Sequence, residues 1–228
     1  MITTTRFFSA IFLFFYFTSL FAQDEPPFRF GIRGGGNLYS GILNVAPEIS
    51  KKLHVGYQLG FTAEYEFKDN AYLQTEVSFI TKGVVYKSAE TLGNGVKQWT
   101  QDFTLNYMQV PLLMAYKLEI EENISLYFHG GPYFAYGIGG KTRLKITHKQ
   151  AEGEDVDTSQ DSFGENGFKK LDIGIRFGSG LEFEKYTIGF DFEYGLTNIS
   201  RKDTKLSSLL NDRGFKNKGV CLSLGYKF

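Results

Sequence analysis

Residues 53–67 read LHVGYQLGFTAEYEF, and apolar side chains occupy every second position of this stretch. Between them stand polar or small residues, among them His54, Gln58, Thr62 and Glu64. A period of two residues is the spacing of a β-strand, whose successive side chains point to opposite faces. An α-helix would repeat its apolar positions every three or four residues. This stretch therefore predicts a strand with one apolar face and one polar face.

The same alternation recurs along the chain and predicts eight strands. They are residues 28–39, 53–67, 71–85, 103–117, 124–138, 168–181, 185–197 and 219–228. The fourth contains Pro111, which cannot donate to a strand ladder, so we expect a bulge or a change of register there. The connections alternate between short ones, at 68–70, 119–123 and 183–185, and long ones, at 40–52, 86–102, 139–167 and 198–218.

The length of the apolar segments decides how this chain would meet a membrane. After the N-terminal region no apolar run is long enough for a transmembrane helix, so only a closed barrel could span a bilayer. The high aromatic content of 17% and the alternation of short turns with long loops are typical of outer-membrane barrels. The sequence therefore predicts an all-β fold, an eight-stranded antiparallel up-and-down transmembrane β-barrel with both termini in the periplasm.

The N-terminal segment has the composition of a secretory signal peptide. Arg6 precedes the apolar run FFSAIFLFFYFTSLF at 7–21, and Ala22 is followed by polar residues. We expect residues 1–22 to be a cleaved signal peptide and residues 23–228 to be the outer-membrane barrel domain. An uncleaved anchor helix is the alternative, but the run is shorter than the ~20 residues that a span needs. The residue directly after the expected cleavage site is Gln23 and not a Cys, which argues against a lipoprotein.

Composition argues against several functional classes. With 25 basic and 25 acidic side chains in 228 residues, the chain lacks the basic excess of a nucleic-acid binder. Cys221 is its only cysteine, so neither a disulfide nor a cysteine metal cluster forms within the chain. The three histidines lack metal-site spacing, and none has a Ser two residues later, as lipid A deacylases of this size require. We expect no cofactor, no metal and no enzymatic activity.

Charged side chains recur on the inward face of the predicted strands. An eight-stranded barrel encloses a lumen that side chains can just fill, so the charges must pair. We expect an ionic plug whose members are Arg33, Glu64, Glu76, Arg176, Asp191 and Glu193. The repeated Gly-Ile-Arg at 31–33 and 174–176 makes Arg33 and Arg176 the candidates that organise it. A narrow conducting path remains the alternative.

Two of the long loops carry opposite charge. Residues 151–167 contain six acids and no base, and residues 198–218 contain six bases and two acids. Asp155, Asp157, Ser159 and Asp161 partly match a calcium loop, but Gln160 stands where its turn glycine belongs, so a solvated acidic loop is the expectation. Either the two loops attract each other, or the basic loop contacts lipopolysaccharide phosphates.

Five sequence motifs resemble a known family. They are FGIRGGGN at 30–37, YMQVPLL at 107–113, GGPY at 130–133, YGLTNI at 194–199 and LSLGYKF at 222–228. Together they resemble the small outer-membrane β-barrel proteins of Bacteroidetes, a Gram-negative group, often described as PorT-like. The resemblance implies location and architecture, and its namesake belongs to a type IX secretion system. The last motif is also similar to the C-terminal signal read by the outer-membrane assembly machinery, carried here by Leu222, Leu224, Tyr226 and Phe228.

Three functions stay open at this point. The first is an envelope-structural or surface-interaction barrel, the second a PorT-like secretion component, and the third a soluble lipocalin-like periplasmic carrier. A carrier would need an apolar lumen and a polar exterior, and the continuous apolar face favours the membrane instead. The expected partners are outer-membrane lipid and lipopolysaccharide, the assembly machinery, and an unidentified surface or secretion partner.

Overall fold

A computed structural model describes residues 28–42, 50–92, 95–149, 154–163, 167–200 and 214–228. The signal peptide expected at 1–22 lies outside these residues. The strands are β1 (Phe28–Ile42), β2 (Ser50–Lys68), β3 (Ala71–Leu92), β4 (Gly95–Glu121), β5 (Ile124–Gly139), β6 (Lys141–Lys149), β7 (Val156–Asp161), β8 (Leu171–Phe183), β9 (Tyr186–Gly195) and β10 (Lys216–Lys227).

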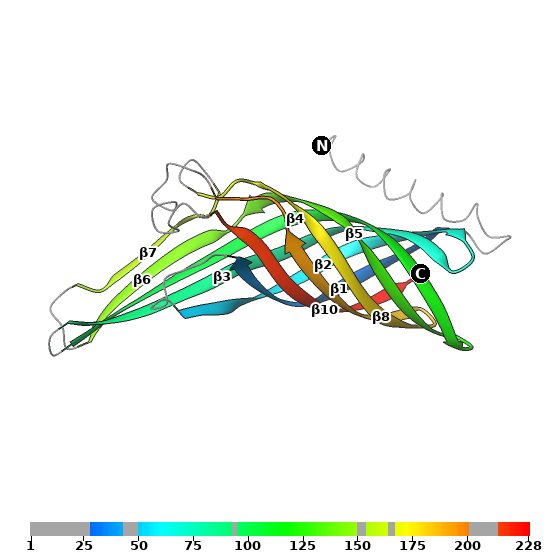
Figure 1. The fold of residues 1–228 in the computed structure, drawn as a ribbon, viewed down its shortest axis with the longest axis horizontal. Helices are drawn as coiled ribbons and strands as arrows, with labels where there is room; N and C mark the ends of the chain where they lie inside the picture. Colours follow the sequence, from blue (N-terminus) through cyan, green and yellow to red (C-terminus); the bar gives the residue numbers. More distant parts are fainter. Residues whose placement is uncertain (1–27, 43–49, 93–94, 150–153, 164–166, 201–213) are drawn as a thin grey trace, which may run out of the picture.

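Eight of these strands close into a ring. Their order is β3-β2-β1-β10-β9-β8-β5-β4, and antiparallel pairing of β3 with β4 completes the circle. Figure 1 shows the strands inclined to the barrel axis. These eight strands correspond to the eight predicted from the period-two pattern, so the predicted fold class is confirmed.

Close packing of the backbone explains the glycine-rich first strand. Gly35 pairs with Ser223 of β10, and a Cβ atom at Gly35 would lie 2.1 Å from the carbonyl oxygen of Leu222. No side chain fits at that separation. Gly35, together with Gly31, whose Cβ would lie 2.5 Å from the carbonyl oxygen of Tyr226, therefore permits close pairing of the first and last strands.

Two-residue turns join strands at one end of the barrel. β2 and β3, β4 and β5, and β8 and β9 are connected there, and Asn70, Asn123 and Glu184 take positive φ in these turns. Such φ values suit two-residue hairpin turns. The short connections predicted near these positions are confirmed. β1 begins and β10 ends at the same end, because Gly31 pairs with Lys227.

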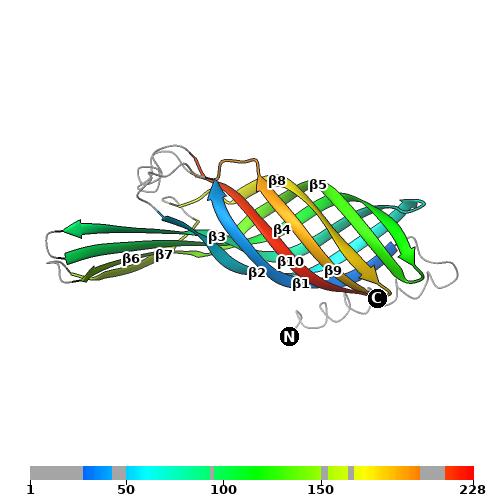
Figure 2. The ribbon, with the colours of Figure 1, turned by 60° about the horizontal axis from the view of Figure 1, so that its bottom comes forward.

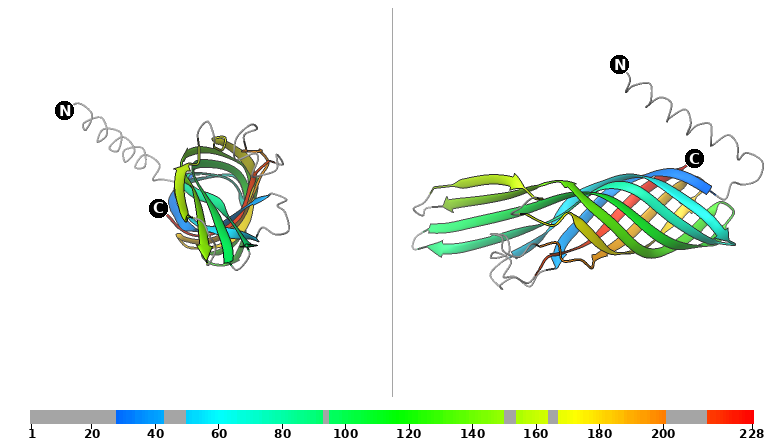
Figure 3. Two further views of the ribbon diagram at one scale, coloured as in Figure 1. Left: turned by 90° about the vertical axis from the view of Figure 1, so that its left-hand side faces the viewer. Right: turned by 90° about the horizontal axis from the view of Figure 1, so that it is seen from above.

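The opposite end differs from the prediction. Figures 2 and 3 show β3, β4, β6 and β7 running on past the ring as a projecting sheet, which we call the platform. It comprises β3 from about Val84 to its end, β4 from its start to about Phe103, and the whole of β6 and β7. Residues 86–102 and 139–167 were expected to be loops, and that expectation was wrong for residues 86–92, 95–102, 141–149 and 156–161, which form strands. These strands are solvated on much of their surface, so they lack the strong apolar face from which the other strands were recognised.

The bulge or change of register expected at Pro111 is also absent. The pairing of β4 with β5 keeps one register from Tyr107 to Glu119, and its two irregularities lie instead between Asn106 and Tyr107 and between Glu119 and Glu121. The register with β3 also runs unbroken past Pro111, whose carbonyl accepts a hydrogen bond from Thr75 Oγ1 at 2.7 Å. The ladder therefore tolerates the missing donor without a bulge.

The barrel is apolar outside and polar inside. Val55 is 75% exposed, Phe61 72% and Leu224 64%, whereas charged side chains such as Lys82, Arg176 and Glu193 are fully buried. This distribution is the reverse of that in a soluble protein, and it suits a barrel surrounded by lipid. Within the described residues, no helix has the length and apolar character needed to cross a membrane.

Candidate functional site

The six predicted interior residues all point into the lumen. They come from β1, β2, β3, β8 and β9, and the most exposed side chain among them, Arg33, is only 12% accessible. Five of them, all except Glu64, are joined by direct ion pairs in one cluster. Glu64 lies nearer the two-residue turns and connects to that cluster through hydrogen bonds described below.

Arg33 and Arg176 share one carboxylate. Glu76 lies 3.5 Å from Nη1 of Arg33 and accepts a hydrogen bond from Nη1 of Arg176 at 2.9 Å. Arg33 also pairs with Asp191, and Arg176 Nε donates to Glu193 Oε1 at 2.7 Å. Strands β1, β3, β8 and β9 are thus linked through the lumen.

Lys82, which was not among the six, extends this cluster away from the two-residue turns. Its Nζ lies 3.0 Å from Glu193 Oε2 and 3.3 Å from Asp172 Oδ2, and the side chain is fully buried. The ring of Tyr133 stands 4.0 Å from the ammonium, and the rings of Tyr39 and Tyr107 lie slightly farther away. Two carboxylates and three aromatic faces compensate the loss of water around this cation.

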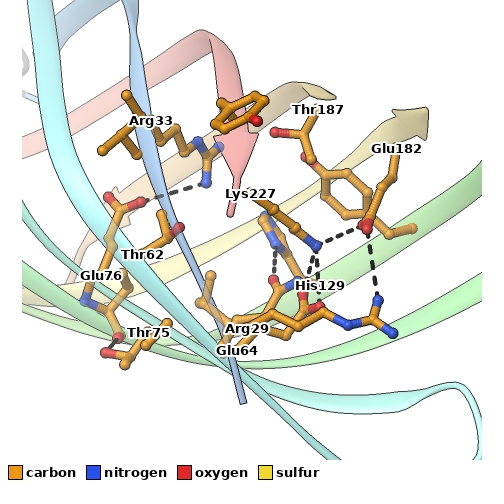
Figure 4. Close-up of a pocket in the computed structure, with 17 residues that line it drawn as sticks. Arg29, Arg33, Thr62, Glu64, Thr75, Glu76, His129, Glu182, Thr187 and Lys227 are labelled. Carbon is orange, nitrogen blue, oxygen red and sulfur yellow. Dashed lines mark hydrogen bonds and ion pairs between the residues drawn. The ribbon is translucent and has the colours of Figure 1, made fainter. Parts of the chain in front are cut away.

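Near the two-residue turns, two lysines and two glutamates form an alternating square. Lys117 Nζ lies 2.5 Å from Glu64 and 2.9 Å from Glu182, and Lys227 Nζ lies 3.1 Å and 2.7 Å from the same two groups. Glu64 on β2 and Glu182 on β8 stand four strands apart around the ring, as do the two lysines on β4 and β10. The square therefore braces the barrel across both diameters. Figure 4 shows Lys227 reaching toward Glu182 and Glu64.

His129 connects the square to the arginine cluster. Its Nδ1 lies 2.8 Å from Gln74 Oε1 and its Nε2 lies 2.5 Å from Asp191 Oδ1. The Gln74 amide is oriented by its own donation to Glu64 Oε2 at 2.6 Å. Both ring nitrogens thus face side-chain oxygens, and His129 lies between the square and the arginine cluster.

Charge in the lumen is balanced. The acids are Glu64, Glu76, Asp172, Glu182, Asp191 and Glu193, and the bases are Arg29, Arg33, Lys82, Lys117, Arg176 and Lys227. Every one of these carboxylates has a basic partner within 4.0 Å. An unpaired charge at such depth would cost several kcal/mol, on the order of 3–5. Pairing allows this many charges to be buried.

A small polar cavity opens beneath the arginine cluster. Its volume is about 60 Å³, and Arg29, Glu64, His129 and Lys227 are among the residues that line it (Figure 4). A space of this size holds a few water molecules. It is too small for a ligand of ordinary metabolite size.

Aromatic side chains close the other end of the lumen. Phe103, Phe168 and Phe215 are fully buried, and Phe168 lies 5.3 Å and 5.1 Å from the other two ring centroids. The Phe168 and Ile199 segments are held by backbone hydrogen bonds, from Phe168 N to Ser162 O and from Ile199 N to Phe215 O. We call Phe103, Phe168, Ile199 and Phe215 the lid. The sequence prediction missed it and placed Phe168 in a strand, although β8 begins at Leu171.

The predicted C-terminal residues form the outer face of β10. Leu222, Leu224 and Phe228 are each at least 60% exposed, and Tyr226 packs edge-on against Tyr186 at 5.3 Å. Phe228 N donates to Phe30 O, which ties the end of the chain to β1.

The acidic stretch is a strand rather than a calcium loop. Asp157, Ser159 and Asp161 lie on β7 opposite Lys145, Arg143 and Lys141 of β6. Among the described residues, no group of three His, Cys, Asp or Glu side chains could hold a metal ion. Most of the basic loop, at 201–213, lies outside the described residues, so pairing between the two loops stays untested.

Comparison with known proteins gives the following similarities. A family described as "Outer membrane protein beta-barrel domain" matches residues 21–201. Neisserial surface protein A is 13% identical over 87% of this chain and 97% of its own, with a TM-score of 0.39. Ail of Yersinia pestis, solved in complex with the heparin analogue sucrose octasulfate, is 17% identical over 88% and 99%, with a TM-score of 0.36. OprG of Pseudomonas aeruginosa is 17% identical over 88% and 95%, with a TM-score of 0.40. No curated protein matches the chain.

Proposed function

The chain belongs to the outer membrane protein beta-barrel domain family, and from this premise we propose that it is a closed, non-enzymatic barrel that acts through its outer surfaces. The observation that carries the proposal is the filled lumen, in which a paired ionic network lies beneath an aromatic lid. Among the described residues, the polar cavity beside this network measures only about 60 Å³, which is too small for a substrate of metabolite size. The role is envelope structure or surface interaction.

Single-channel recording tests the closed lumen. The purified full-length protein, reconstituted in planar bilayers, should give no discrete conductance steps beyond those of detergent alone. Heat-modifiable migration on a gel verifies in the same preparation that the barrel is folded. Steps of uniform size from folded protein would refute the closed barrel and favour a narrow pore.

We propose that the two-residue turns and both termini face the periplasm and that the platform faces outward. Short turns on the periplasmic side are usual for such barrels. The single cysteine, Cys221, is buried, so a Cys221→Ser background with Ser159→Cys or Asp69→Cys gives a clean labelling test. An impermeant maleimide on intact cells should label Ser159→Cys and spare Asp69→Cys. The reverse pattern would overturn the orientation.

Outer-membrane lipid and lipopolysaccharide are the proposed surroundings. Lys170 lies over the ring of Tyr136 at 5.7 Å, and Lys218 over the ring of Phe192 at 5.3 Å, near the platform end of the barrel. Cations over outward rings at a membrane edge suit phosphate headgroups. The combined Lys170→Gln and Lys218→Gln changes should reduce co-purifying lipopolysaccharide, and an unchanged amount would refute the contact.

The assembly machinery is a second proposed partner. The apolar, outward-facing end of β10 supports this reading, since Leu222, Leu224 and Phe228 stay accessible along the final strand. Leu222→Ser with Phe228→Ser should leave the chain in the periplasm. Normal outer-membrane yield would count against a recognition role.

The finer assignment to a PorT-like secretion component in Bacteroidetes rests on the motif resemblance alone. Deletion of the gene in a host with type IX secretion should then block export of the secreted enzymes, and normal export would leave the structural role. The soluble-carrier alternative gains no support from an ionic lumen and an apolar exterior.

A further inference from the structure

The platform ends in a strand with an open edge. β7 is the last strand of the sheet and pairs only with β6 among the described strands. All six of its residues are exposed, on both faces. The N–H and C=O groups that point away from β6 are therefore available to another strand.

Side chains along this edge specify what would fit. Lys141, Arg143 and Lys145 form an exposed basic row on one face of β6. Asp157 and Asp161 lie directly opposite Lys145 and Lys141, so the next row outward is acidic. A further strand would place its own side chains opposite these two carboxylates, and bases are favoured at such positions.

The side chains on the other face of β7 carry no charge. Val156, Thr158 and Gln160 alternate with the acids, and Val156 lies opposite Ile146 of β6. β-Branched side chains on an added strand would pack well there. The favoured partner therefore has two bases separated by three residues, with β-branched residues between them.

Pairing with a second copy of the chain fits poorly. Antiparallel pairing of two β7 strands centred on Ser159, with like faces aligned, sets Asp157 opposite Asp161, and centring on Thr158 sets Asp155 opposite Asp161. Like charges directly opposite are destabilising. Two barrels in one membrane would also present their β7 strands running in the same direction, since β7 runs along the long axis of the molecule (Figure 3).

We propose that the open edge of β7 binds an extended, basic segment of another protein by strand addition. Backbone hydrogen bonds would supply affinity, and Asp157 and Asp161 would select the bases. This deepens the surface-interaction role and rests on it, but the channel recordings test the closed lumen separately.

The test uses full-length protein in detergent micelles and a fluorescein-labelled peptide, Thr-Lys-Val-Thr-Val-Lys-Thr, followed by fluorescence anisotropy. Saturable binding is expected, and the analogue with Glu in place of both Lys should not bind. Two further peptides carry N-methyl groups on one or the other alternating set of residues. One of them should bind at least tenfold more weakly, because only one set of N–H groups faces β7.

Asp157→Asn combined with Asp161→Asn should weaken binding of the parent peptide by about tenfold, the loss expected for two exposed ion pairs. Asp69→Asn, in the β2–β3 turn, is the matched control and should leave the dissociation constant unchanged. Heat-modifiable migration shows that each variant is folded. Absence of peptide binding overturns the proposal, as does equal affinity for both N-methylated peptides and the parent. Self-association that the double change abolishes would instead identify a second copy as the occupant.

Discussion

Replacing Arg176 by Met is the sharpest test of the ionic network. Arg176 is fully buried, and its guanidinium contacts Glu76 at 2.9 Å and Glu193 at 2.6 Å. Removing one partner of a buried pair costs about 3–5 kcal/mol, since it leaves a carboxylate uncompensated. Glu76 keeps Arg33 and Glu193 keeps Lys82, so we expect the lower end of that range, about 3 kcal/mol.

The assay is equilibrium unfolding in urea, with the full-length protein in detergent micelles and folding followed by circular dichroism. Arg143→Met on the exposed face of β6 is the matched control, and its effect should stay within about 0.5 kcal/mol. Adding Glu76→Gln to Arg176→Met removes one acid with one base and leaves Arg33 paired with Asp191. The double variant should therefore recover at least ~1 kcal/mol relative to additivity.

Two results would refute this reasoning. The first is a free energy of unfolding for Arg176→Met equal to that of Arg143→Met. The second is strict additivity of Arg176→Met and Glu76→Gln, which would mean that the two side chains do not interact in the folded barrel.

Three other outcomes are expected. Arg33→Met should lower the melting temperature, because Asp191 and Glu76 both lose a partner; an unchanged melting curve would contradict its place in the cluster. His129→Phe keeps a ring but removes the contacts of its nitrogens with Gln74 and Asp191, so it should destabilise by about 1–3 kcal/mol in the same urea assay, and a neutral result would argue against hydrogen bonding by this ring. Phe168→Ala should cost about 3 kcal/mol without creating conductance in planar bilayers, because the ionic network below the lid stays in place; channel openings would show that the lid alone closes the lumen.

The prediction of the site was partial for a physical reason. Arg33, Glu76 and Arg176 were identified because they occupy the alternate positions that point into the barrel. Successive side chains of a strand point to opposite faces whatever the strand pairs with. Alternation shows which side chains point inward but not where they lie along the barrel axis. Lys117 and Glu182 were therefore not predicted to be partners in one square. The position of His129 between Gln74 and Asp191 depends on partners 55 and 62 residues away in sequence, so no local pattern pointed to it.

Some signals were present but weak. β6 alternates Lys141, Arg143 and Lys145 with Thr142, Leu144 and Ile146, which is a readable period of two. The acidic composition of the following stretch suggested a loop instead. β7 offers no apolar face at all, so only its pairing with β6 defines it as a strand.

The alternating pattern of side chains was enough to predict the eight strands of the ring, the apolar face of each strand, and the presence of charges inside. It could do so because lipid on one side and a filled lumen on the other impose a period of two on every strand that lies between them. Which acid meets which base could not be read from this pattern, because the stagger of the strands sets the height of each side chain in the lumen. The lid and the platform depend on the fold as well, since contacts between separate segments hold their residues in place and β7 has no apolar face of its own.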